Sequence, residues 1–371
     1  MIPLSVLDVV PVGEGQTSAE AMAASLELAR RADALGFERL WFAEHHNMPS
    51  IASTTPEVLI ARAGMVTERI RLGSGGVMLP NHAPYKVAET FKMLEALHPG
   101  RIDLGLGRAP GTDQLTAAAL RRSSDAVVQD RFQSELAELL AFGRGEFPAG
   151  HPFQAVKAYP DEVPLPPIWL LGSSDYSAHL AAAVGMGFSF AAHFSQHPAE
   201  LPMRAYRERF QPGWFPEPHA ILAVGVLCAP TAEEADFLAC SADLMWARMR
   251  SGDLRRIPTP EEGRAYAYSP FERQVVDAVR RAGFAQHPRA QMRLSPEVRP
   301  DQLERHHAVD QDVARPVHDA HATLTEQRLE AITPGDDAAQ IRVFGAARSR
   351  SCGCHERTAS WSHPGWRAAP R

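Results

Sequence analysis

Short apolar runs alternate with longer amphipathic segments along most of the chain. Apolar runs bounded by turn residues are typical of buried strands, and an apolar residue every three or four positions is typical of a helix. Strands are expected at residues 4–10, 40–43, 70–79, 102–106, 168–171, 188–192 and 221–228. Helices are expected from residues 17, 56, 84, 125, 175, 199 and 231 onward. A weaker eighth pair is expected at 308–314 and 319–332.

Several of the expected helices begin with capping residues. Thr17 with Glu20, and Thr231 with Glu234, have the spacing of a capping box, in which side chain and backbone bond reciprocally. Thr55 precedes a proline, which suits the first turn of a helix, and is expected to cap the next helix. These signals place the helix starts directly after the expected strands.

The order of strands and helices predicts a parallel α/β sheet with right-handed crossovers. Two folds share this pattern, an open doubly wound sheet and a closed TIM (β/α)8 barrel. A dinucleotide-binding open sheet would carry Gly-x-Gly-x-x-Gly in its first strand–helix turn, where this chain has only Gly13 and Gly15. Gly105-x-Gly107 continues with Arg108 and does not match either. Seven or eight units therefore favour the barrel.

Three segments fall outside the repeat. Residues 143–167 are rich in proline and glycine and are expected to form a long connection. Residues 250–269 are polar and are expected to form a mobile lid. Residues 333–371 lack sustained periodicity and are expected to be a disordered or extraneous tail. The expected barrel domain is thus 1–332, with a divergent eighth unit.

The composition argues against several classes of partner and location. Among 371 residues, 38 Lys and Arg stand against 44 Asp and Glu, which gives a formal net charge of −6. No strong basic stripe appears in roughly the first two thirds of the chain, so nucleic acid is not an expected partner. No apolar run reaches the ~18 residues of a transmembrane helix, and no signal-peptide pattern is seen. Four scattered cysteines fit a reducing cytoplasm better than a disulfide framework.

Polar residues gather where the expected strands end, and a barrel carries its active site there. The sharpest feature is Glu44-His45-His46 after the second strand. Histidine is a natural acid–base group near neutral pH, and a neighbouring carboxylate can orient it. A metal site is disfavoured because adjacent strand side chains point to opposite faces. The structural alternative is a hydrogen-bonded histidine network. Other polar groups at strand ends are Asn81, His82 and His193.

Gly172-Ser173-Ser174 before the fifth helix has the character of an anion cradle. Backbone amides and hydroxyls at a helix amino end suit a phosphate, and Arg108 at a neighbouring strand end would supply charge. The alternatives are plain helix capping by Ser174 and a surface ion pair of Arg108.

Glycines also interrupt the expected third strand. Ser74-Gly75-Gly76 marks either a close approach of a ligand or a tight bend of the barrel.

Three long stretches, residues 41–46, 73–82 and 98–111, resemble the bacterial luciferase-like monooxygenases, and the similarity runs from about Leu4 to Ala282. The resemblance implies a TIM barrel that takes reduced FMN from a separate flavin reductase and activates O2. It also implies a homodimer. Gly107 stands where luciferase has a reactive cysteine, so no thiol chemistry is expected. From about residue 283 the similarity weakens, which points to a divergent eighth unit.

The resemblance also implies roles for individual residues. His45, with Glu44 beside it, would be the acid–base residue, and a non-proline cis peptide would join Gly75 and Gly76 under the flavin. The flavin phosphate would lie on Arg108, Ser173, Ser174 and Ser177, and the substrate side would be lined by His46, Asn81, His82 and His193.

These features predict a cytoplasmic monooxygenase that uses reduced FMN and O2 to oxidise a small organic substrate through a peroxyflavin. One alternative is a deazaflavin-dependent dehydrogenase on the same fold, which would transfer hydride and ignore O2. A second alternative is a non-catalytic flavin-binding paralogue.

Overall fold

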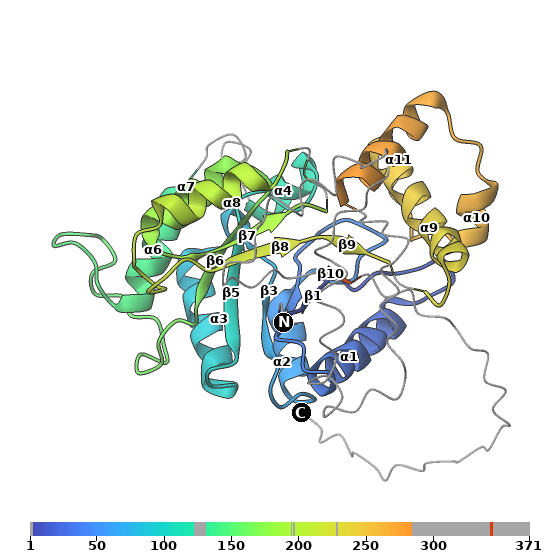
Figure 1. Ribbon diagram of the computed structural model, residues 1–371. Coiled ribbons are helices and arrows are strands. Elements are labelled where there is room, and N and C mark those ends of the chain that lie inside the picture. Colours follow the sequence, from blue (N-terminus) through green and yellow to red (C-terminus); the bar gives the residue numbers. More distant parts are fainter. Residues whose placement is uncertain are drawn as a thin grey trace, which may run out of the picture.

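Seven parallel strands form the wall of a nearly closed barrel (Figure 1). The computed structural model describes residues 3–121, 131–193, 195, 197–227, 229–283 and 342–343. Within them the barrel order is β1-β2-β3-β5-β6-β7-β8, with every neighbouring pair parallel. The TIM-barrel prediction is confirmed. These strands are β1 (Ser5–Asp8), β2 (Arg39–Phe42), β3 (Arg71–Ser74), β5 (Ile102–Gly107), β6 (Ile168–Gly172), β7 (Gly187–Ala191) and β8 (Ala220–Ala223).

Helices follow the strands and cover the outside of the barrel. Thr17 accepts from the amide of Glu20 at 3.2 Å and donates its own amide to the Glu20 carboxylate at 2.8 Å, so this capping box is confirmed. Thr231 likewise accepts from the amide of Glu234. The expected side-chain cap at Thr55 is wrong, since no such hydrogen bond forms there. The helices are α1 (Ser18–Ala34), α2 (Pro56–Gly64), η1 (Leu79–Asn81), α3 (Pro84–Leu97), α4 (Gln114–Arg121), α6 (Phe132–Arg144), α7 (Asp175–Val184), α8 (Glu200–Arg209), α9 (Ala232–Arg250), α10 (Pro260–Ala265) and α11 (Pro270–Gly283).

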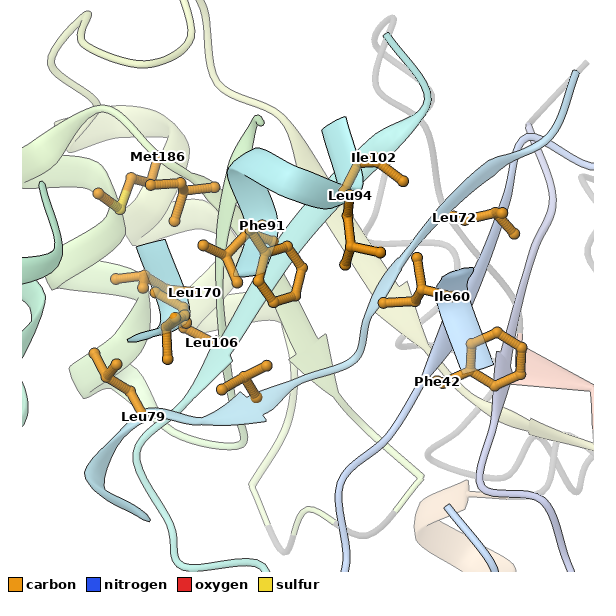
Figure 2. Close-up of a cluster of buried hydrophobic side chains, with 14 of the residues drawn as sticks. Phe42, Ile60, Leu72, Leu79, Phe91, Leu94, Ile102, Leu106, Leu170 and Met186 are labelled. Carbon is orange, nitrogen blue, oxygen red and sulfur yellow. The ribbon is translucent and has the colours of Figure 1, made fainter. Parts of the chain in front are cut away.

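Alternate residues of each strand face outward and pack under the helices. Phe42 and Leu72 from β2 and β3 meet Ile60 of α2, while Leu106 of β5 lies near Phe91 of α3 (Figure 2). All five are buried. Because burying one such side chain stabilises a fold by about 1.5–3 kcal/mol, this layer fixes helices onto the strands.

The residues that face inward form a second cluster inside the barrel. Trp41 and Trp169 meet edge to face with ring centroids 5.5 Å apart, and Ile221 packs with them. Gly73 lies opposite Trp41 in the register and Gly187 opposite Trp169. A Cβ at Gly73 would lie 2.8 Å from the Trp41 ring, and one at Gly187 would overlap the Trp169 ring. Glycine is therefore what lets two tryptophans fill one barrel.

A charged group lies inside the barrel on the amino-terminal side of the tryptophans. The Asp103 carboxylate is fully buried and accepts from Arg39 Nε at 3.1 Å and from Trp41 Nε1 at 3.2 Å. It also accepts from Arg71 Nη2 at 2.6 Å. Buried charges persist when they are paired and hydrogen-bonded in this way. These three charged residues are called the Asp103 cluster below.

Some expected segments differ from the structure. The single strand expected at 70–79 is two strands, β3 and β4 (Val77–Met78), separated by a cis peptide bond between Gly75 and Gly76. In place of the helix expected at 125–142, the structure has α6, while residues 122–130 lie outside the described chain. Of the connection expected at 143–167, residues 145–167 contain no strand or helix, while residues 143 and 144 end α6.

The segment expected to be a lid, residues 250–269, has defined contacts. It contains α10, which packs against α9. Upstream of α10, the amide of Ile257 donates to the carbonyl of Val12 at 3.0 Å, and the carbonyl of Ile257 accepts from the amide of Glu14 at 2.8 Å. The segment is therefore joined to the loop that follows β1, at the carboxyl end of the barrel.

The predicted eighth unit, at 308–314 and 319–332, lies outside the described residues. A short strand, β10 (Arg342–Val343), pairs in parallel with β9 (Gly225–Val226) and contacts β1. It falls in the range predicted to be a tail, and the domain boundary at 332/333 stays a prediction.

Candidate functional site

Glu44, directly after β2, holds two histidines at the carboxyl end of the barrel. Its side chain is fully buried, and Oε1 accepts from Nε2 of His46 at 2.8 Å. His82 Nε2 donates to both carboxylate oxygens, at 2.9 and 3.0 Å, and the Met78 amide donates to Oε2 at 2.9 Å. Glu44, His46 and His82 are called the Glu44 cluster below. It joins the end of β2 to the end of β4 and the helix η1.

The neighbours of Glu44 keep its carboxylate ionised. Burial alone would raise the pKa of Glu44, but hydrogen bonds from His82 and His46, the charge of His82 and the Met78 amide lower it. Burial would also lower the pKa of His82, but the hydrogen bond and charge of Glu44, with a contribution from Glu57, raise it. The pair therefore favours a carboxylate beside an imidazolium.

The Glu44 carboxylate contacts His46, and His45, the immediate neighbour of Glu44, lies against backbone carbonyl groups. The Glu44 carboxylate binds His46, two positions along, because extended residues i and i+2 share a face. His45 is partly buried, its Nδ1 lies 3.2 Å from the carbonyl of Gly111, and its amide donates to the carbonyl of Ser53 at 3.0 Å. A carbonyl partner makes Nδ1 the N–H nitrogen of His45. The expectation that Glu44 orients His45 is replaced by a Glu44–His46 contact.

Asn81 connects this cluster to the loop after β5. Its Nδ2 donates to the carbonyl of Pro110 at 2.9 Å and lies 3.4 Å from Glu44 Oε1. Its Oδ1 accepts from Arg121 Nε of α4 at 3.2 Å. The structure thus brings His46, Asn81 and His82 together around Glu44, and their place on the substrate side stays a prediction.

The cis peptide between Gly75 and Gly76 lies at the end of β3, as expected from the resemblance. The amide of Gly75 donates to the carbonyl of Phe42 at 2.7 Å. A Cβ at Gly76 would lie 2.7 Å from the carbonyl oxygen of Gly105. Only glycine fits so close to a neighbouring backbone, which explains why two glycines interrupt this strand.

Arg108 and the amino end of α7 form the second part of the site. Arg108 follows β5, is exposed, and places its Cζ 4.0 Å from the ring centroid of Tyr176 in the first turn of α7. Ser174 occupies the N-cap position but makes no side-chain capping bond, so plain capping by its hydroxyl is not what the structure shows. A guanidinium, a hydroxyl and helix amides thus lie at one end of α7, a set of donors that suits a phosphate.

The remaining predicted residues lie near these two groups. Ser177 is buried under Gly172, and its Oγ donates to the carbonyl of Leu171 at 3.1 Å. The carbonyl of Ser173 accepts from Ser195 Oγ at 3.0 Å. His193 is buried after β7, and its Nδ1 lies 3.3 Å from the Ala223 carbonyl at the end of β8.

Sequence reasoning missed several contributors to the site. Tyr176 stacks on Arg108, and the backbone amide of Met78 and the side chain of Arg121 complete the hydrogen bonds around Glu44 and Asn81. The spacing of Glu44 and His46 was a usable signal, whereas backbone amides carry none. No group of three or more His, Cys, Asp or Glu side chains in the described ranges could hold a metal ion. Nor does any described helix have the length and apolar content to cross a membrane.

The fold is a TIM barrel, and its carboxyl end carries a carboxylate bonded to two histidines and an arginine stacked at the first turn of α7. The model of the luciferase-like monooxygenase family matches residues 2–326. The chain belongs to the luciferase-like monooxygenase family.

Characterised relatives and solved structures agree with this assignment. A luciferase-like monooxygenase of Escherichia coli (strain K12) is 42% identical over 276 residues, 74% of this chain and 81% of the relative. The N-acetyl-S-alkylcysteine monooxygenase of Bacillus subtilis (strain 168) is 40% identical over 268 residues, 72% and 79% of the two chains. The crystal structure of apo-MsnO8 superposes with a TM-score of 0.70 at 33% identity and covers 92% of each chain.

More distant structures share the fold alone. They include the oxygenating constituent of 3,6-diketocamphane monooxygenase from Pseudomonas putida in complex with FMN, with a TM-score of 0.51 at 18% identity over 68% of this chain and 78% of that one. An F420-dependent secondary alcohol dehydrogenase has a TM-score of 0.53 at 15% identity over 76% and 84%. The same barrel therefore occurs with two types of flavin cofactor.

Proposed function

We propose that this protein is a monooxygenase that uses reduced FMN and O2 to oxidise a small organic substrate. The observation that carries the proposal is the contact between Arg108 and Tyr176, because it brings a guanidinium to the amino end of α7. The Glu44 cluster at the same end of the barrel supplies acid–base groups. Family membership supplies the reaction class.

The donors at the end of α7 fit the phosphate of FMN. Arg108, the hydroxyl of Ser174 and the first amides of α7 would hold it, with Ser173 and Ser177 shaping the turn from β6. Gly75 and Gly76 would allow the close approach of a ring system. Reduced flavin, when bound, supplies the electrons that activate O2.

The imidazoles of this chain would hold and move protons. His46 donates its Nε2 hydrogen to Glu44, so Nδ1 is the acceptor nitrogen of its neutral ring. His45, held through Nδ1 by the Gly111 carbonyl, presents Nε2 in the same way. His45 remains the proposed acid–base residue, and Glu44 acts by holding His46 and His82. His193 and Asn81 are proposed to line the substrate side.

The first experiment measures O2 consumption and H2O2 release when a separate flavin reductase supplies reduced FMN. We expect the protein to delay H2O2 release relative to free reduced FMN, because a flavin bound in a protein site is shielded from water. A relative acts on N-acetyl-S-alkylcysteines by name, so substrate screening would begin with thioethers. Release of H2O2 at the rate seen with free reduced FMN would refute the proposed monooxygenase function.

Variants at the acid–base groups test the roles of the residues. His45→Gln and Glu44→Gln are each expected to slow substrate oxidation by about 10²-fold or more, the usual size of an acid–base contribution. The control is His179→Gln, which changes an exposed histidine on α7. Unchanged rates in both site variants would refute the proposed roles of His45 and Glu44, whereas a wild type that oxidises no substrate would favour a non-catalytic flavin-binding protein.

The deazaflavin alternative rests on fold likeness to the F420-dependent dehydrogenase. It predicts hydride transfer that does not respond to O2, so the same O2 measurement separates the two functions. We also propose a transient flavin reductase partner, a homodimer and a cytoplasmic location, as the resemblance implies.

A further inference from the structure

Arg108 is an exposed arginine whose guanidinium is nevertheless held in place. Its Cζ lies 4.0 Å from the centre of the Tyr176 ring, well inside the ~6 Å range of a cation–π contact. A guanidinium whose face covers a ring holds its N–H groups at the ring edge, in the fork geometry that suits two parallel bonds to an anion. The stack thus favours a geometry suited to phosphate.

The ring of Tyr176 is in turn fixed by the fold. Tyr176 is partly buried and packs against the main hydrophobic core. It lies in the first turn of α7, whose preceding strand end is tied down by the bond from Ser177 to the carbonyl of Leu171. The core therefore positions the ring, and the ring positions the guanidinium.

The charges near α7 make this positioning necessary. A phosphate monoester carries about −1.5 to −2 charges at pH 7. The amino end of a helix offers only about +0.5. Asp175, exposed in the first turn of α7, adds a negative charge at the same place. Arg108 must supply much of the compensating charge, so its orientation should matter for affinity.

We infer that Tyr176 is a positioning residue that presents Arg108 to the phosphate of the flavin and thereby sets the preference of this site for phosphorylated over unphosphorylated flavin. This inference rests on the proposed function, because it assumes that a flavin phosphate binds at the amino end of α7. The inference gives Tyr176 a role in flavin binding although the flavin need not contact Tyr176.

The test compares the dissociation constants of FMN and riboflavin by flavin fluorescence. The proteins are the wild type, Tyr176→Phe, Tyr176→Leu and Arg108→Ala. Tyr176→Phe keeps the aromatic face and should bind FMN as the wild type does. Tyr176→Leu should weaken FMN binding by about 3- to 30-fold, the range of a cation–π contact, and leave riboflavin binding unchanged.

The outcomes separate this inference from the proposed function. If Tyr176→Leu binds FMN as tightly as the wild type while Arg108→Ala does not, the positioning role is wrong and the phosphate site stands. If Tyr176→Leu weakens FMN and riboflavin equally, the ring acts only through packing, and the inference is overturned. If Arg108→Ala binds FMN normally, the phosphate does not lie on Arg108 and the inference is overturned, while the monooxygenase function is still decided by the H2O2 measurement.

Discussion

The two ends of the barrel each contain a buried carboxylate, but they stabilise it with different partners. Asp103, on the amino side, accepts from two arginines and an indole. Glu44, on the carboxyl side, accepts from two imidazoles and a backbone amide. Guanidinium stays protonated in proteins, whereas imidazole gains and loses a proton near neutral pH. Burial is similar at both ends, but the partners of Glu44 include His82, an imidazole whose pKa the neighbouring carboxylate raises.

The glycines near the two carboxylates also differ in how easily their neighbours could move aside for a larger side chain. Next to the Asp103 cluster, the Trp41 and Trp169 rings pack so closely on Gly73 and Gly187 that a Cβ at either glycine would clash with a ring. Near the carboxyl end, a Cβ at Gly107 would meet only the end of the flexible Met78 side chain, 2.6 Å from its sulfur. A methyl group at Gly187 would thus meet a ring fixed in the core, whereas a methyl group at Gly107 would meet the end of a side chain that can rotate.

Neutralising Asp103 should give the largest loss of stability. In Asp103→Asn the Arg39 and Arg71 guanidinium groups lose their shared counter-charge, and Arg39 is almost entirely buried. Breaking one partner of a buried ion pair costs about 3–5 kcal/mol of unfolding free energy. Urea denaturation followed by circular dichroism would measure this loss.

The matched control at the other end is Glu44→Gln. His82 can release its proton when its carboxylate partner is neutralised, so no buried charge is left without a partner. We expect Glu44→Gln to lose less stability than Asp103→Asn near pH 8. Equal losses would show that the two carboxylates have the same structural role.

A pair of glycine substitutions tests the difference in packing. The expected loss of stability is smaller than that of Asp103→Asn. Gly187→Ala places a methyl group into the Trp169 ring, and overpacking of this kind costs about 1–3 kcal/mol. Gly107→Ala meets the end of Met78, which can rotate away, and should cost less. Thermal melting of both variants measures the difference, and a more damaging Gly107→Ala would contradict it.

The sequence predicts the barrel well because strand–helix alternation is a local pattern. The capping box at Thr17 and Glu20 and the paired glycines 75 and 76 are also local, and the structure bears both out. Thr55 shows the limit of local signals, since its position is right and its hydrogen bond is absent. Local sequence thus places elements and some caps.

The side-chain contacts of the two clusters join residues far apart in the sequence, so they depend on how neighbouring strands align rather than on local sequence. Glu44 binds His82, 38 residues away, and Asp103 binds Arg39, 64 residues away. Such pairs arise because parallel strands align Arg39 with Arg71, and Gly73 with Asp103. No single segment encodes this alignment, so the sequence did not predict that His82 is a partner of Glu44. The stack of Tyr176 on Arg108 was unpredictable for the same reason.

The smallest expected effect is a pH dependence of stability that only the Glu44 cluster should produce. The raised pKa of His82 contributes stability that is fully present below its ordinary value of 6.5 and is lost as pH rises through the raised pKa. The lowered pKa of Glu44 contributes stability above its ordinary value of 4.5, which is lost as pH falls through the lowered pKa. The ion pair should therefore stabilise the fold most between pH 4.5 and 6.5.

His82→Gln tests this window, because glutamine can still donate to Glu44 but does not titrate. Urea denaturation across pH should show the largest stability difference from the wild type within the window, narrowing at higher pH by at most about 1.4 kcal/mol per pH unit, the limit for one proton. His179→Gln, at an exposed position on α7, serves as the control. A difference that does not vary with pH would mean that His82 stays neutral beside Glu44.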